Sequence, residues 1–236
     1  MNYSPLITKG AGLVLLAAPA LAQHGHLNSG AVGKNQGDAL SFLNGAAFAA
    51  ESGYTKVLNG STSGTYAGYY EGGITLTAVH ALSGTDSQGI PYVANPNSAA
   101  PGSLIQVGIV SVTGPAGSSF QFWEESATAP TFSYNSGFST TTPDLVILSD
   151  VSLGAGTAGG DPYGHLHGRR FTASTPGEYT IGFQLFDTSM NGVGGGPIHA
   201  PSEVLNIRFT AVPEPETLAL AAAGLALVVW GVRRRA

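Results

Sequence analysis

The sequence predicts an all-β protein whose body is a single antiparallel β-sandwich. Short segments of alternating apolar and polar residues recur along the chain, and Gly, Pro, Asn or Ser turn signals bound them. Between the two ends, no segment sustains the 3.6-residue period of an amphipathic helix. Glycine accounts for 34 of 236 residues and charged residues for only 10%, which suits many tight turns between short strands. Two packed sheets of the immunoglobulin-like kind are therefore expected.

Residues 1–22 predict a secretory signal peptide that precedes the fold. Lys9 is the only charge there, and an apolar run extends from Gly12 to Ala22. Ala20-Leu21-Ala22 forms an A-x-A cleavage site for signal peptidase. Cleavage after Ala22 would leave a folded body of residues 23–212.

The body then divides into short strands. They are expected at 54–58, 65–70, 74–81, 104–113, 118–124, 145–152, 168–173, 178–187 and 203–211. Segment 38–50 is ambiguous, and two short strands are favoured there because Gly45 weakens a helix. Both faces of 104–113 are apolar, which indicates a central strand. Tyr179, Ile181, Phe183 and Leu185 alternate with less apolar residues and are predicted to point into the core. Loops are expected at 83–102, 127–143, 154–164 and 190–201.

The charge of the body restricts its partners. Five basic residues stand against 12 acidic ones, which gives a net charge of −7. This balance disfavours nucleic acid and anionic membrane surfaces and suits a cation. The chain contains no cysteine, so a transition-metal site would have to use histidine, carboxylate or backbone oxygen.

The histidines are the candidate metal ligands. Four of the six form two His-x-His pairs, His24-Gly25-His26 and His165-Leu166-His167. In extended chain, residues i and i+2 point to the same side, so both imidazoles of one pair can reach one ion. Zinc takes about four N, O or S ligands, and two pairs would complete one site. His199, on a proline-braced loop, is a further candidate ligand.

Each histidine also has a plainer interpretation. His24 and His26 could belong to a solvated N-terminus, and His165 and His167 to a polar loop end. His199 could equally be structural. His80 continues the apolar face of its strand and is predicted to be buried and hydrogen-bonded. Asp161 and Glu203 are carboxylates close in sequence to the histidines and could serve as ligands or as hydrogen-bond acceptors for the ligating imidazoles.

The C-terminal residues 213–236 form a separate element. Pro213-Glu214-Pro215 is followed by an uncharged run from Leu218 to Val232 and then by Arg233, Arg234 and Arg235. The run is shorter than the roughly 20 residues that a stable membrane anchor needs, and the arginines are expected to hold the end on the cytoplasmic side. This pattern resembles the PEP-CTERM sorting signal. The resemblance implies a transmembrane sorting helix, removal by an exosortase-type enzyme, and export of the body through the inner membrane to the cell surface.

A second resemblance covers the body. The segment 164–172, Gly-His-Leu-His-Gly-Arg-Arg-Phe-Thr, and the segment 175–180, Thr-Pro-Gly-Glu-Tyr-Thr, are similar to a G-H-x-H repeat of bacterial surface-anchored proteins. The body as a whole resembles the PEP-CTERM family repressed by the zinc-uptake regulator. The resemblance implies a surface protein made when zinc is scarce. Together with the histidine pairs, it predicts zinc as the cofactor, in acquisition or storage.

Two other classes of function stay open. Aromatic side chains expected on the surface, namely Tyr69, Tyr70, Trp123 and Tyr134, suit a structural or carbohydrate-binding protein of an extracellular polysaccharide matrix. A copper-dependent polysaccharide monooxygenase would need His24 as the mature N-terminal residue, and Gln23 is a poor residue at the preceding position. No Ser-His-Asp or paired-carboxylate arrangement stands out, so the protein is expected not to be an enzyme.

Overall fold

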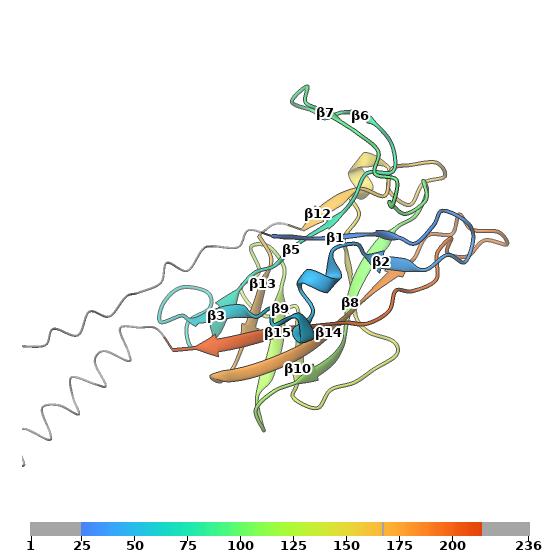
Figure 1. Ribbon diagram of the computed structural model, residues 1–236. Helices are drawn as coiled ribbons and strands as arrows, with labels where there is room; N and C mark the ends of the chain where they lie inside the picture. Colours follow the sequence, from blue (N-terminus) through green and yellow to red (C-terminus); the bar gives the residue numbers. More distant parts are fainter. Residues whose placement is uncertain (1–24, 167, 214–236) are drawn as a thin grey trace, which may run out of the picture.

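The computed structural model describes residues 25–166 and 168–213, and their regular structure consists of β-strands and three short 3₁₀ helices (Figure 1). The all-β prediction is confirmed for these residues. The predicted signal peptide, the sorting helix, His24 and His167 lie outside the described residues. Among the described residues, no helix is long and apolar enough to span a bilayer.

The larger sheet has nine strands in the order β10-β9-β13-β4-β3-β15-β14-β8-β11. Along the chain these are β3 (Lys56–Gly60), β4 (Tyr70–Gly72), β8 (Ile105–Thr113), β9 (Ser119–Trp123), β10 (Phe132–Asn135), β11 (Leu145–Ile147), β13 (Arg170–Ala173), β14 (Gly177–Asp187) and β15 (Leu205–Val212). The long strands β8, β14 and β15 lie side by side. They supply the most extensive pairing in the sheet.

The smaller sheet has four strands in the order β12-β5-β1-β2. They are β1 (His26–Ala31), β2 (Leu40–Phe42), β5 (Thr75–Ala78) and β12 (Gly164–Leu166). A separate two-stranded arm of β6 (Gly84–Thr85) and β7 (Pro91–Tyr92) projects beyond this sheet (Figure 1). The 3₁₀ helices are η1 (Gly45–Ala47), η2 (Ala50–Ser52) and η3 (Val151–Leu153).

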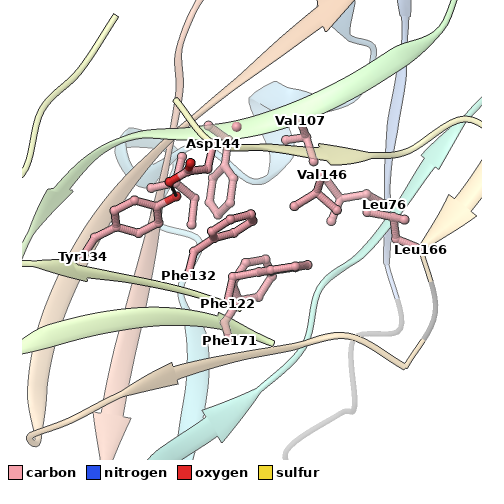
Figure 2. Close-up of a pocket in the computed structure, with 12 residues that line it drawn as sticks. Leu76, Val107, Phe122, Phe132, Tyr134, Asp144, Val146, Leu166 and Phe171 are labelled. Atoms are coloured by element: carbon pink, nitrogen blue, oxygen red, sulfur yellow. Dashed lines mark hydrogen bonds between the residues drawn. The ribbon is translucent and has the colours of Figure 1, made fainter. Parts of the chain in front are cut away.

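The core lies where apolar side chains of the two sheets meet. Leu76 and Leu166 of the smaller sheet lie with Phe122, Phe171 and other large apolar side chains of the larger sheet around one small void (Figure 2). The void measures about 20 Å³, which is room for a single water molecule at most. This space is therefore a well-packed core and not a ligand pocket. Tyr179, Ile181, Phe183 and Leu185 are all buried in the core, as their alternation predicts.

The structure corrects several strand predictions. Two pairings are parallel, β1 with β5 and β15 with β3, where a wholly antiparallel arrangement was expected. Both partners in each pair are far apart in sequence, so no hairpin turn constrains their direction. Segment 65–70 is a turn up to Tyr70, β10 lies within the expected loop 127–143, and β1 was not predicted. In 38–50, β2 is followed by 3₁₀ turns.

Tyr134 supplies a polar contact at the edge of the void. Its hydroxyl donates a hydrogen bond to Asp144 Oδ2 at 3.2 Å (Figure 2). Burial raises the pKa of the Tyr134 phenol above its usual value of 10.0, and the Asp144 charge and this hydrogen bond raise it further. The folded state therefore favours the neutral phenol.

This shift predicts a loss of stability at alkaline pH. Above about pH 10 the phenol ionises more readily in the unfolded chain, so unfolding becomes more favourable as the pH rises. Urea unfolding at about pH 8 and about pH 11 should show a smaller loss for Tyr134→Phe than for the wild type. Tyr69→Phe, which removes a hydroxyl with no carboxylate partner among the described residues, should behave like the wild type. An equal loss in wild type and Tyr134→Phe would contradict this account.

Candidate metal site

The centre of the candidate site is β5, which lies between β1 and β12 in the smaller sheet. Register places His26 of β1 beside Thr75 and His165 of β12 beside Thr77. The two imidazole rings come together across β5, with centroids 4.7 Å apart and planes inclined at 46°. One histidine from each His-x-His pair therefore reaches the same place, although 139 residues separate them in the sequence.

The backbone around His165 needs the glycine that precedes it. A Cβ built at Gly164 would lie 2.0 Å from the Leu148 carbonyl oxygen. Such an overlap is impossible, so a larger residue would push β12 away from its neighbours. Gly164 thus helps to set the position of His165.

Thr77 supports His26 from the central strand. The Thr77 hydroxyl oxygen lies 3.2 Å from His26 Nδ1. If Nδ1 carries the proton and donates to Thr77, Nε2 retains the lone pair that a metal ion needs. A hydrogen bond on the second ring nitrogen is the usual way in which proteins orient a ligating imidazole.

His24 and His167, the other members of the two pairs, lie outside the described residues. Within residues 25–166 and 168–213, no group of three or more His, Cys, Asp or Glu side chains is placed to hold a metal ion. The described part of the site therefore consists of His26 and His165, with Thr77 behind the former.

His199 is in a structural position. It is 2% exposed, and its Nε2 accepts a hydrogen bond from the Ala100 N–H at 2.9 Å. Its Nδ1 lies 2.9 Å from the Asp38 carbonyl oxygen and must be the donor there. Both ring nitrogens are occupied, so no lone pair is available for a metal ion. Of its two interpretations in the sequence, the structural one fits this geometry.

His80 is hydrogen-bonded, as predicted, but it is only partly buried, with its side chain 19% exposed. Its Nδ1 lies 2.9 Å from Asp161 Oδ2, and its ring stacks between Tyr92 and Tyr163 at centroid distances of 3.9 and 3.6 Å. The other oxygen of Asp161 accepts the N–H groups of Ala81 and Tyr163. Asp161 is therefore a partner of His80. No sequence signal pointed to the two tyrosines, of which Tyr92 belongs to β7 and Tyr163 directly precedes β12.

Glu203 does not join the histidines. Its side chain is exposed, and among the described residues no hydrogen bond or ion pair links its carboxylate to an imidazole. Of the two carboxylates that the sequence offered, only Asp161 contacts a histidine.

Two of the aromatic residues expected on the surface are buried. Trp123 donates its indole N–H to Thr172 Oγ1 at 2.8 Å and packs against Tyr66 and Tyr69. Tyr134 is equally buried. A polar partner inside the fold satisfies the one polar group of each ring, which allows burial. Tyr69 and Tyr70 are only partly exposed.

Comparison with known families concerns the C-terminal end. Residues 211–235 match the family described as the PEP-CTERM protein-sorting motif. The chain carries a PEP-CTERM sorting signal. The match includes Pro213, Glu214, Pro215 and the arginines 233–235, so the predicted sorting motif is confirmed. PEP-CTERM sorting implies export, processing by an exosortase-type enzyme, and sorting to the cell surface. No curated protein and no solved structure matches this PEP-CTERM protein.

Proposed function

We propose that this PEP-CTERM protein binds one zinc ion at the cell surface through its two His-x-His pairs and serves zinc acquisition or storage. The observation that carries the proposal is the approach of His26 and His165 across β5. Zinc–nitrogen bonds of about 2.0–2.1 Å and tetrahedral angles put the centroids of two bound imidazoles about 5 Å apart. The spacing of 4.7 Å between these rings is close to that requirement.

The proposed ligand set is His24, His26, His165 and His167. The two neighbours enter the set because each lies two residues from a described ligand and extended chain directs such side chains to one side. Thr77 orients His26 from behind. His199 is left out, since both of its nitrogens bind backbone groups.

Calorimetric titration of the purified protein with zinc tests the proposal. At about pH 7.5 we expect saturable binding of one ion per chain. Zinc binds neutral imidazole, so protons compete with it and the affinity should fall below about pH 6. Absence of saturable binding to the folded protein would reject zinc and leave the matrix-protein function as the better candidate.

Processing at both ends is part of the proposal. We expect the mature protein to begin at Gln23 and to lose the segment that follows Pro213, because an A-x-A site and a short apolar run mark these positions. Intact-mass measurement of protein released from the cell surface should find neither terminal segment. A stable membrane-bound form that retains Trp230 would contradict removal of the tail.

A structural or carbohydrate-binding role in the polysaccharide matrix is the alternative. Its support is weaker than the sequence suggested, because Trp123 and Tyr134 are buried and cannot stack on a sugar. A copper monooxygenase would depend on His24 as the mature N-terminus, which the predicted cleavage after Ala22 does not produce.

A further inference from the structure

A polar cleft of about 460 Å³ opens beside His26. Its lining comes from β1, β5 and β12 of the smaller sheet and from β3, β4 and β13 of the larger sheet. Three of the five basic residues of the body line it, namely Lys56, Arg169 and Arg170. Glu71 is the one acidic residue among the lining residues. The cleft thus concentrates positive charge on a body whose net charge is −7.

Each of the two arginines is held by one carboxylate, Arg169 by Glu124 and Arg170 by Glu71. Arg169 Nε lies 2.6 Å from Glu124 Oε2, and Arg170 Nε lies 3.2 Å from Glu71 Oε2. In each ion pair the carboxylate lies against Nε of the arginine. The two terminal nitrogens, Nη1 and Nη2, can therefore donate hydrogen bonds to another acceptor. The planar arrangement of these donors matches the oxygens of a carboxylate or phosphate group.

Lys56 has no such anchor. In the part of the chain that the structure describes, its ammonium group makes no ion pair. Burial lowers the pKa of Lys56, and the Arg170 charge lowers it further, while Glu71 opposes this only in part. A partly buried lysine held beside an arginine gains stability from an added anion.

Gly73 makes room for the Arg170 side chain. A Cβ at Gly73 would lie 3.0 Å from Arg170 Nη1. A Cβ at Gly72 would lie 3.5 Å from Lys56 Cε, which is ordinary van der Waals contact, so Gly72 lies beside Lys56 but is not needed to make room for it. Larger residues at Gly73 would displace the guanidinium.

We propose that this cleft binds an oxyanion, the carboxylate or phosphate group of a small ligand, through Lys56, Arg169 and Arg170. The volume suits this class, since small-molecule sites span roughly 300–1,000 Å³. The site goes beyond the proposed zinc function and does not rest on it, because the three cationic side chains bind the anion without a metal ion.

The test is calorimetric titration, in low-salt buffer, of purified protein from which zinc has been removed with a chelator and the chelator then removed by dialysis. Inorganic phosphate and trigalacturonate are the two probes, and neutral maltotriose is the control for sugar binding without charge. Binding of phosphate alone identifies a phosphate site, and binding of trigalacturonate alone identifies a carboxylate site. Added salt should weaken binding of either anion.

Lys56→Gln is the main variant, because within residues 25–166 and 168–213 Lys56 makes no ion pair whose loss would disturb the fold. We expect its dissociation constant for the bound anion to rise roughly tenfold. Arg170→Gln should have a comparable effect, and Arg170→Lys, which keeps the charge opposite Glu71, a smaller one. Lys34→Gln removes the same charge from an exposed position outside the cleft and should bind like the wild type.

Failure of both anions to saturate the wild type would overturn the proposal. Equal weakening by Lys34→Gln and Lys56→Gln would do the same, since overall charge would then explain the binding. Binding that appears only after zinc is added would assign the anion to the metal ion instead of the cleft. If the wild type binds the anion but shows no saturable zinc binding, the proposed zinc function is rejected and the anion site stands.

Discussion

Replacing His165 and His167 together with alanine is expected to abolish zinc binding and the stabilisation that comes with it. A ligand that binds only the folded state stabilises it by about 2.7 kcal/mol when its free concentration is 100 times the dissociation constant. The wild type should therefore gain about this much on addition of zinc, and the double variant should gain nothing. Urea unfolding with and without zinc measures the difference directly.

A single variant on β1, His26→Ala, tests whether the two His-x-His pairs share one zinc ion. His26 lies on β1 and His165 on β12, with their rings 4.7 Å apart. If both pairs share one ion, His26→Ala should weaken zinc binding strongly even though the His165 pair is intact. If each pair binds its own ion, His26→Ala should instead halve the stoichiometry. His80→Ala removes a histidine whose partner is Asp161 and should leave the zinc response intact.

Replacing His199 with leucine is expected to lower the free energy of unfolding by about 1–3 kcal/mol. Leucine would leave the Ala100 N–H without its hydrogen-bond acceptor, and a buried donor without a partner costs about 1–3 kcal/mol. The Asp38 carbonyl oxygen would lose the His199 contact but would still accept the Ala200 N–H at 3.2 Å. The loss is an appreciable part of the roughly 5–15 kcal/mol that stabilises a typical domain. The midpoint of urea unfolding reports the loss.

A glutamine at the same position provides the matched control. Its side-chain amide can donate one hydrogen bond and accept another, so His199→Gln should lose clearly less stability than His199→Leu. The folded fraction of either variant should bind zinc like the wild type, since His199 is not a proposed ligand. Unchanged stability of His199→Leu, or loss of zinc binding by a well-folded His199→Gln, would contradict the structural role.

Residue patterns alone were sufficient to predict a strand, and the direction of its side chains, where one face of the strand is buried and the other is not. The alternation of Tyr179, Ile181, Phe183 and Leu185 predicted β14 and its inward face, because the two-residue period of a strand is local. The segment of β8 was predicted from a different pattern, apolar residues on both faces, and both faces are largely buried. The PEP-CTERM signal was also readable directly, since its residues are contiguous and a family match covers 211–235.

Strand direction and short edge elements could not be predicted in this way. The parallel pairing of β1 with β5 joins segments that are distant in sequence, and their direction depends on how the intervening chain crosses the fold. Strand β10 is short, and the Ser, Thr and Pro residues around it are typical of a loop, so it was not predicted. Its pairing with β9 comes from tertiary contacts that local propensity does not contain.

For the candidate site, the sequence by itself determined the ligand type, through two His-x-His pairs in a chain without cysteine. Only the tertiary structure decided which histidines meet. It places β1 and β12 on either side of β5, which brings His26 to His165, and it engages both nitrogens of His199 with backbone groups. The reason is physical: strand order, and the partners that a side chain meets in the fold, depend on how the two sheets pack, and residue spacing along the chain does not specify either of them.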